Sequence, residues 1–268
     1  MTTNLHEIKE VLQQALLQGG KILRENFGDK HDYKVKENQS SIVTQTDLDA
    51  EKTIKDLIRK SFPKHNILAE EEGYENNNSE YTWVVDPLDG SSNYQAGLGW
   101  FGVLIATLQK QEVVLAGAYL PMTDELYLAQ KGKGATRNGA TIQVSTETTL
   151  ENVLFAYGLD AAEEKKLVQD MKYIEQVVRS VRNLRSTNSA VDFCYVADGR
   201  LGGFINQTTK AWDVAASQLI IQEAGGVVTD ICGDPLEYDF TNPGKNYTFV
   251  AANPSLHKQV MKFIDTQY

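Results

Sequence analysis

Two aspartates three residues apart interrupt an apolar run near position 85. Trp83, Val84 and Val85 have the side chains of a buried strand end, and Asp86 and Asp89 follow them around a proline. Proline has no N–H with which to continue strand pairing. Carboxylate oxygens are hard ligands of the kind that Mg²⁺ prefers. The spacing therefore predicts two acids at one strand end, where a divalent cation would neutralise them.

The residues after this pair have the types found at a helix start. Gly90 tolerates a backbone shape that other residues resist, and Ser91, Ser92 and Asn93 readily cap a helix. The N–H groups at a helix N-terminus bind phosphate. Residues 83–94 thus predict a site for a divalent cation and for a phosphate that the cation bridges. The alternative is an ordinary Asp-Gly turn between two strands.

Several familiar sites do not match these residues. An EF-hand loop has ligands at alternating positions and a closing Glu, and the Asp86/Asp89 spacing breaks that pattern. The stretch also lacks the glycine run and the Lys-Ser/Thr pair of a P-loop. A zinc site of imidazoles and a phosphohistidine mechanism are disfavoured, because every histidine lies outside the motif. The histidines are His6, His31, His65 and His257.

Three further acidic positions stand where a regular element is predicted to begin or end. Asp47 lies in the first turn of a predicted helix, Glu70 follows the apolar run 67–69, and Asp213 precedes a helical run at 214–224. Each has an ordinary explanation. An acid near a helix N-terminus favours the helix dipole, and the three glutamates that begin at Glu70 suit a solvated loop. Because the same pattern recurs at each position, these acids are candidates for one shared site.

Apolar periodicity divides the first half of the chain into two helices and a set of strands. A first helix is predicted over 5–27, and a second begins at Thr44 and ends at Pro63, with Leu48 on its apolar face. Residues 74–81 are predicted to form an exposed loop. The predicted strands, whose short separations favour an antiparallel meander, are 67–69, 83–85, 100–108, 113–120, 125–129 and, after an Asn138-Gly139 hairpin, 141–144.

The pattern changes near residue 145, which predicts two domains, 1–145 and 146–268, without a flexible linker. The second half alternates strands and helices. Its predicted strands are 153–159, 201–206, 227–231 and 247–251. Its predicted helices are 162–180, 190–197, 214–224 and a last one that starts at Pro254.

Composition limits the partners of the protein. The 268 residues carry a formal charge of −10, which argues against a nucleic-acid surface because phosphate backbones recruit Lys and Arg. Residues 1–10 carry charges without an apolar core, and no apolar run is long enough to span a membrane. We therefore expect a cytoplasmic protein without a membrane partner. Cys194 and Cys232 form no C-x-x-C motif and are predicted to be reduced, buried thiols.

Motifs that occur in a set order span most of the chain. The diagnostic stretch is 83–91 with Asn93 and Tyr94, and a second runs from Trp212-Asp213-Val214-Ala215-Ala216 to Glu223-Ala224-Gly225-Gly226. Supporting matches are Val43-Thr44-x-Thr46-Asp47, Glu70-Glu71 and Gly132-x-Gly134-Ala135. In content and in order, these motifs resemble those of the inositol monophosphatase family.

The resemblance implies an α+β fold, a layered αβαβα sandwich related to that of sugar bisphosphatases. It also implies a Mg²⁺-dependent, lithium-sensitive phosphomonoesterase that acts on small phosphorylated metabolites and forms a homodimer. Glu70, Asp86 and the Leu88 carbonyl would hold a first Mg²⁺, Asp86, Asp89 and Asp213 a second, and Glu70 would help with a weaker third. Hard oxygen ligands suit this ion, and two metals about 3.5–4 Å apart can stabilise both the entering and the leaving oxygen.

The remaining roles implied by the resemblance concern the phosphate and the attacking water. The Gly90 and Ser91 amides, next to Ser92, would bind the phosphate. Ser91, paired with Asp47, would orient the water, so that Asp47, Ser91 and Glu70 are the candidate catalytic residues. Phosphoryl transfer needs mainly positioning and charge neutralisation, which this set of residues can supply.

The candidate substrate contacts depart from the pattern of inositol-specific relatives. Asn206 stands where those relatives have a Glu, and Asn188 stands where a Gly often precedes the pair Ser189-Ala190. Lys36 matches a basic residue at the mouth of the site, or is a solvated loop lysine. Inositol monophosphate is the first predicted substrate, with NADP(H) and fructose 1,6-bisphosphate as alternatives. A noncatalytic metal-binding homologue is the alternative of another class.

Overall fold

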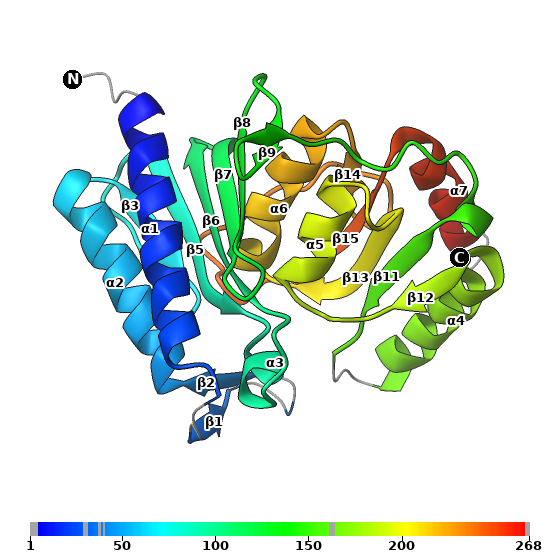
Figure 1. The fold of residues 1–268 in the computed structure, drawn as a ribbon, viewed down its shortest axis with the longest axis horizontal. Helices are drawn as coiled ribbons and strands as arrows, with labels where there is room; N and C mark the ends of the chain where they lie inside the picture. The colour runs from blue at the N-terminus through cyan, green and yellow to red at the C-terminus, as the bar shows by residue number, and fades with distance from the viewer. Residues whose placement is uncertain (1–4, 29–31, 37–38, 40, 161–163, 266–268) are drawn as a thin grey trace.

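Helices and sheets alternate in five layers across the molecule (Figure 1). This computed structural model describes residues 5–28, 32–36, 39, 41–160 and 164–265. The outer helices on one side are α1 (Leu5–Glu25) and α2 (Gln45–Ser61), the middle layer is α5 (Ala190–Ala197) and α6 (Ala211–Glu223), and the outer helices on the other side are α4 (Glu164–Ser180) and α7 (Pro254–Asp265). The predicted αβαβα sandwich of the α+β class is confirmed.

The first sheet has eight strands in the order β10-β9-β8-β7-β6-β5-β3-β4. They are β3 (Asn66–Ala69), β4 (Gly73–Glu75), β5 (Tyr81–Asp89), β6 (Gly102–Gln109), β7 (Glu112–Leu120), β8 (Glu125–Gln130), β9 (Ala135–Arg137) and β10 (Ala140–Thr141). Neighbours are antiparallel, except that β3 and β5 are parallel. The predicted meander is confirmed. So is the hairpin, in which Asn138 and Gly139 have φ of 49° and 80°.

Three local predictions in this half are wrong. The loop expected at 74–81 contains part of β4, because this short segment finds hydrogen-bond partners on β3 at the sheet edge. The strand expected at 141–144 ends at Thr141, because the chain then crosses to α6, where Val144 N–H donates to the Ala224 carbonyl at 3.0 Å. Leu48 is 42% exposed, so it lies outside the apolar face of α2.

The second sheet has five strands in the order β12-β11-β13-β15-β14. They are β11 (Leu154–Gly158), β12 (Asn183–Arg185), β13 (Gly203–Thr209), β14 (Val227–Thr229) and β15 (Tyr247–Ala252). β11 is parallel to β12 and β13, and the other pairs are antiparallel. The sequence missed only β12 among the described strands of this sheet. The helix predicted over 162–180 is confirmed from Glu164, and residues 162 and 163 lie outside the described residues.

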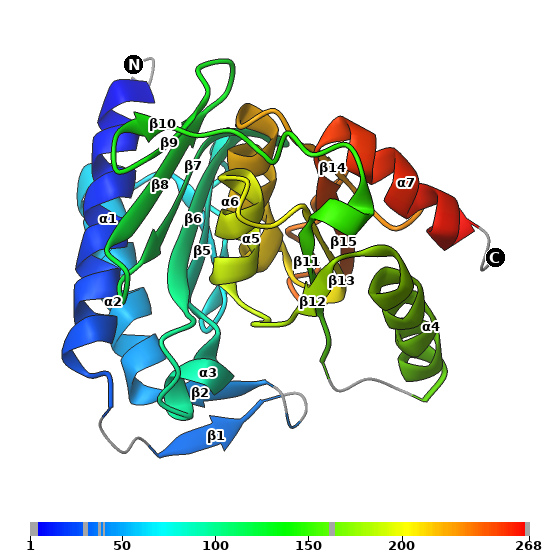
Figure 2. The same ribbon diagram turned by 45° about the vertical axis from the view of Figure 1, so that its right-hand side comes forward.

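Helix α6 is buried on nearly all sides because a sheet packs on each of its faces. It contacts β5 to β8 in the first sheet and β14 and β15 in the second (Figure 2). Its buried residues are Ala211, Val214, Ala215, Ala216, Ser217, Leu219, Ile220 and Ile221. A helix that is buried all round has no polar face, which accounts for the strongly apolar run in the sequence. The first turn of this helix, with Asp213, is thereby held in the middle layer.

The predictions outside the two sheets have mixed outcomes. β1 (Tyr33–Val35) and β2 (Ile42–Thr44) form an antiparallel ribbon, as the short strand fragments indicated. Both cysteines are free thiols, and Cys194 is buried, but Cys232 is exposed because it lies in a turn after β14. The boundary proposed at residue 145 lies between β10 and β11 and stays a prediction. Among the described helices, none is long and apolar enough to cross a membrane.

Candidate active site

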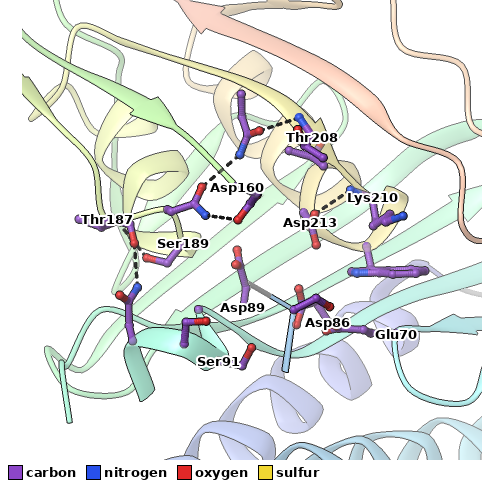
Figure 3. Close-up of a pocket in the computed structure, with 18 of the residues that line it drawn as sticks. Glu70, Asp86, Asp89, Ser91, Asp160, Thr187, Ser189, Thr208, Lys210 and Asp213 are labelled. Atoms are coloured by element: carbon purple, nitrogen blue, oxygen red, sulfur yellow. Dashed lines mark hydrogen bonds between the residues drawn. The ribbon is translucent and has the colours of Figure 1, made fainter. Parts of the chain in front are cut away.

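A cavity of about 630 Å³ lies where the ends of β5 and β13 meet helix α3 (Ser91–Gln95) and the first turn of α6 (Figure 3). Most of the predicted site residues line it together. They are Lys36, Glu70, Asp86, Leu88, Asp89, Gly90, Ser91, Ser92, Asn188, Ser189, Asn206 and Asp213. Asp47 and Ala190 are not part of the lining, and both are buried.

The end of β5 brings two carboxylates to the cavity. Residues three apart on a regular strand face opposite sides of a sheet, but the pairing of β5 with β6 is irregular between Asp86 and Asp89. Pro87 has no N–H for the neighbouring strand at this point. The Leu88 amide donates to Oδ1 of Asp86 at 3.0 Å instead of to a strand carbonyl. The irregularity allows both aspartates to line the same cavity.

The start of α3 lies beside these acids. Gly90 is the N-cap of the helix with φ of 100°, and a Cβ there would lie 2.7 Å from the carbonyl oxygen of Trp100. Glycine alone adopts this conformation without strain. The expectation of a serine cap is therefore corrected, because the helix already begins at Ser91. Ser91 and Ser92 line the cavity, where a helix start attracts anions.

Glu70 and Lys36 meet on one side of the cavity. The Glu70 N–H donates to the Val85 carbonyl at 3.2 Å, which holds this residue beside β5. Lys36 Nζ lies 2.5 Å from Oε1 of Glu70 and 2.8 Å from Oε1 of Glu71. Burial lowers the pKa of Lys36, but the two glutamates outweigh it and the net shift is upward. The solvated-loop interpretation is wrong for Lys36 and for Glu71, whose side chain is 6% exposed.

Asp47 lies behind the cavity lining. Its Oδ2 accepts from the Thr44 N–H at 2.9 Å and from the Thr44 hydroxyl at 2.5 Å, which caps the N-terminus of α2. Burial raises the pKa of Asp47 to about 6. Across the described residues, no hydrogen bond joins Asp47 to Ser91. The water-orienting pair that the resemblance implies therefore stays a prediction.

Asp213 reaches the cavity from the first turn of α6. Its Oδ2 accepts from the Lys210 N–H at 2.7 Å, so this acid also caps its helix. Burial, together with the charges of Glu70 and Asp160, raises the pKa of Asp213 to about 7. Asp213 therefore caps its helix, as the ordinary explanation expects. Its carboxylate also belongs to the group of mutually repelling acids that line the cavity.

The chemistry of these groups suits a hard divalent cation. Burial raises the pKa of Asp86 and Asp89 well above the ordinary range, and the charges of Glu70 and Asp213 raise it further. Oδ2 of Asp89 is a buried oxygen with no hydrogen-bond partner in the described structure. Leaving such a group uncompensated is costly, and a cation would compensate it. Carboxylate and carbonyl oxygens are the donors that Mg²⁺ takes.

The acids of the cavity do not form a complete coordination shell for a metal ion. Within the described ranges, no group of three or more His, Cys, Asp or Glu side chains is placed to hold a metal ion. The side chains of Glu70 and Asp213 each form a hydrogen bond with Asp86, and the ammonium of Lys36 pairs with Glu70. The assignment of metal ligands stays a prediction.

Two asparagine side chains line the wall that β13 contributes. Asn188 has φ of 51°, a left-handed conformation open to Gly and Asn, which explains why Asn can stand where a Gly was expected. Nδ2 of Asn206 donates to Oδ1 of Asn188 at 3.3 Å, and Nδ2 of Asn188 donates to Oδ1 of Asp160 at 2.8 Å. Ser189, which caps α5, lines the cavity, whereas Ala190 packs in the core beneath it.

The sequence motifs did not indicate several residues of the lining. These are Asp160, Lys166, Thr208, Lys210 and Asn246. Asp160 follows the predicted strand 153–159, as Asp86 follows the predicted strand 83–85, so the same signal was present in the sequence. Lys166 lies on α4 and its Nζ donates to the Gln207 carbonyl at 2.6 Å. Nothing in its sequence surroundings distinguishes it from the other lysines of that helix.

Known proteins resemble this chain over nearly its whole length. A model of the inositol monophosphatase family matches residues 4–266. The chain belongs to the inositol monophosphatase family. This member is 34% identical over 261 residues to the fructose-1,6-bisphosphatase/inositol-1-monophosphatase of Aquifex aeolicus, with 97% of this chain and 96% of that protein covered. It is 33% identical over 264 residues to Nus factor SuhB of Escherichia coli strain K12, with 96% and 95% covered.

Solved structures of similar proteins share the fold of this family member. The extragenic suppressor protein suhB of Bartonella henselae superposes with a TM-score of 0.89 at 29% identity, covering 98% of this chain and 100% of that one. An IMPase of Thermotoga maritima superposes with a TM-score of 0.83 at 31% identity, covering 94% of each chain. The resemblance inferred from the motifs is therefore confirmed at the level of family and fold.

Proposed function

We propose that the protein is a Mg²⁺-dependent phosphatase that hydrolyses a phosphate monoester of a small metabolite. The observation that carries the proposal is the convergence of acids from separate elements. Glu70 after β3, Asp86 and Asp89 on β5 and Asp213 on α6 all line one cavity. The start of α3 at Ser91 borders the same cavity and is a favourable place for a phosphate.

In this proposal Glu70, Asp86, the Leu88 carbonyl, Asp89 and Asp213 hold two or three Mg²⁺ ions. When bound, Mg²⁺ would stabilise negative charge on the phosphoryl oxygens and lower the pKa of a water molecule. These residues offer only oxygen ligands, which fits that ion. Their own task is to keep the carboxylates within one cavity, where each charge acts at short range on the substrate.

The phosphate and the water are assigned to neighbouring residues. The N–H groups of Gly90 and Ser91, with Ser92 beside them, bind the phosphate. The Ser91 hydroxyl accepts a hydrogen bond from the attacking water and donates its own proton toward Asp47. The pKa of Asp47 is raised to about 6 by burial, so this carboxyl is ionised at neutral pH and can act as the acceptor.

Inositol monophosphate is the first candidate substrate, and family membership supports it. NADP(H) and fructose 1,6-bisphosphate are the alternatives, and the name of the relative from Aquifex aeolicus combines a bisphosphatase with an inositol monophosphatase. The proposed substrate contacts are Lys36, Asn188, Ser189, Ala190 and Asn206. Ala190 can contribute only through its backbone, because its side chain is buried in the core.

Other relatives are named Nus factor SuhB. For this chain we propose a small-molecule substrate and no nucleic-acid partner, because a formal charge of −10 opposes binding to phosphate backbones.

A homodimer, inhibition by lithium and a cytoplasmic location complete the proposal. The alternative of another class is a noncatalytic member of the family that binds metal.

The test is phosphate release from inositol 1-phosphate, NADP⁺, fructose 1,6-bisphosphate and 3′-phosphoadenosine 5′-phosphate. Each is assayed with Mg²⁺, with EDTA, and with Mg²⁺ and Li⁺ together. Release that EDTA abolishes and Li⁺ inhibits is the expected result, and the fastest substrate identifies the branch of the family. Absence of release from every ester would contradict the proposal and favour the noncatalytic alternative.

A further inference from the structure

A buried carboxylate of α2 holds the backbone that follows Glu70. This carboxylate belongs to Glu51, which is 1% exposed. Its Oε2 accepts a hydrogen bond from the Glu71 N–H at 2.8 Å, and its Oε1 accepts one from the Glu72 N–H at 2.9 Å. Burying a carboxylate is costly unless its oxygens are hydrogen-bonded. The two backbone amides therefore compensate the burial of Glu51.

Other contacts hold the same segment from β5 and from further along α2. The Glu70 N–H donates to the Val85 carbonyl of β5 at 3.2 Å. One turn after Glu51 on α2, the ammonium of the fully buried Lys55 lies 2.5 Å from Oε2 of Glu72. The three successive amides of residues 70–72 thus all donate, the first to β5 and the next two to α2.

Helix α2 thereby links two acids of the proposed active site. Asp47 lies in its first turn and Glu51 lies one turn later, and residues four apart on a helix share one side of it. Burial raises the pKa of Asp47, and the charge of Glu71 acts in the same direction, so these two carboxylates are within electrostatic range. The helix thus carries Asp47 itself and, through Glu51, holds the loop that begins at Glu70.

We propose that Glu51 is a positioning residue, which holds the backbone of Glu71 and Glu72 and so keeps the Glu70 carboxylate where a divalent cation binds. The inference rests on the proposed phosphatase function. In the described structure Glu51 lies outside the cavity lining, whereas Glu70 and Asp86 face the cavity (Figure 3). Groups that orient metal ligands without touching the metal change metal affinity or activity by about 10–100-fold when they are removed.

Glu51→Gln removes half of this contact and keeps the size of the side chain. Glutamine has one acceptor oxygen, and its NH₂ group only donates, so one of the two backbone N–H groups loses its acceptor. We expect the affinity for Mg²⁺, measured by calorimetry, to fall about tenfold. KM for inositol 1-phosphate at saturating Mg²⁺ should stay within about twofold of wild type, because Glu51 is not proposed to bind the ester.

The matched control is Glu223→Gln, which damages the same kind of contact at another loop. At the end of α6, Glu223 accepts from the N–H groups of Gly132 and Gly134 at 2.7 Å and of Lys133 at 3.0 Å, and it lies outside this cavity lining. Both variants should lower the melting temperature, but Glu223→Gln should keep the wild-type affinity for Mg²⁺. Equal affinities of wild type and Glu51→Gln, or an equal loss in both variants, would overturn the positioning role.

Hydrogen exchange tests the contact itself, without metal or turnover. In EDTA, two-dimensional NMR should show slow exchange of the Glu71 and Glu72 amide protons of wild type, and exchange of at least one of them should be about tenfold faster in Glu51→Gln. The same rates in both proteins would contradict the proposal. If the variant does not fold, the wild type alone decides, because rapid exchange of both amides would exclude the contact and slow exchange would support it.

A failure of the phosphatase proposal itself gives a different result. In that case the wild-type protein binds Mg²⁺ but releases phosphate from no ester. The Mg²⁺ affinities of wild type and Glu51→Gln then still decide whether Glu51 positions Glu70, since a lower affinity of the variant supports this role and an equal one refutes it. A wild-type protein that binds no Mg²⁺ would overturn both proposals.

Discussion

Asp89 combines a buried, unpartnered Oδ2 atom with a pKa raised by burial and by the charges of Asp213 and Glu70. Asp89→Asn should therefore have opposite effects on activity and stability. Phosphate release should fall more than about a hundredfold, because the proposed second Mg²⁺ loses a charged ligand. The melting temperature in EDTA should rise, because a neutral amide removes repulsion from the cavity. Phosphate assays and thermal melts measure the two effects.

The control for Asp89→Asn is Asp234→Asn. Asp234 is exposed and lies outside the cavity lining, so its substitution should change neither the rate of phosphate release nor the melting temperature. Near-normal turnover of Asp89→Asn would contradict its role as a metal ligand. A lower melting temperature of that variant in EDTA would show that the carboxylate stabilises the metal-free protein by contacts other than those described.

Whether the sequence revealed a site residue depended on the motif around it. Asp86 and Asp89 stand in a dense run of unusual residues, and Asp213 follows a tryptophan at a helix start. Asp160 follows a predicted strand, as Asp86 does, but one acid at a strand end is typical of an ordinary loop residue. Its place in the cavity emerges only in the fold, where Asn188 donates to its carboxylate and Asn206 donates to Asn188.

Helix α3 depends on the glycine that precedes it. Gly90→Ala should lower the free energy of unfolding by about 2–3 kcal/mol, because φ of 100° is strained for alanine and its Cβ would lie 2.7 Å from the Trp100 carbonyl oxygen. Gly28→Ala separates the two causes. Gly28 has φ of 92°, and a Cβ added there would have no atom within 4 Å, so only the strain of about 1 kcal/mol applies.

Urea unfolding measures both glycine variants under the same conditions. If Gly90→Ala and Gly28→Ala lowered the free energy of unfolding equally, the close approach of a Cβ at residue 90 to Trp100 would have no energetic cost. The phosphate site provides a second readout. Because α3 must shift to relieve the contact, Gly90→Ala should also weaken inhibition by inorganic phosphate, whereas Gly28→Ala should leave it unchanged.

The elements that the sequence predicted well are those whose own residues determine them. The strands β6, β7 and β8 are apolar runs separated by short turns, and α1 has a regular apolar stripe. The edge strands β4 and β12 were missed because each has three residues and no buried side chain. Such a strand exists because a neighbour distant in the sequence offers it hydrogen bonds, and no local pattern encodes that neighbour.

At the scale of the whole molecule, the layers were predicted through the family resemblance rather than from periodicity. The apolar run of α6 indicated a buried helix, but nothing in the run says that one sheet lies on each of its faces. That placement brings Asp213 to Asp89, although β5 and α6 lie in different halves of the chain. The sequence therefore predicted many of the residues that line the cavity, and the layering determines which of them meet.

The crowded acids tie the stability of the whole fold to pH. The pKa of Asp213 is raised from 3.8 to about 7 and that of Asp47 to about 6. The folded protein therefore keeps protons that the unfolded chain has already lost, so the free energy of unfolding falls as pH rises. The stabilisation is complete below about pH 4 and is lost as pH passes through 6 and 7. In EDTA we expect the melting temperature to fall between pH 5 and pH 7.5.

Millimolar Mg²⁺ should oppose this fall, because a ligand that binds only the folded state stabilises it and ionised carboxylates bind the cation more tightly. At pH 7.5 Mg²⁺ should raise the melting temperature by about 3 °C or more over EDTA, and at pH 5 by much less. Thermal melts at the two pH values measure this, with Asp89→Asn as the variant that should respond least. A melting temperature that is the same with Mg²⁺ and with EDTA at pH 7.5 would contradict the metal site, and with it the proposed source of catalysis.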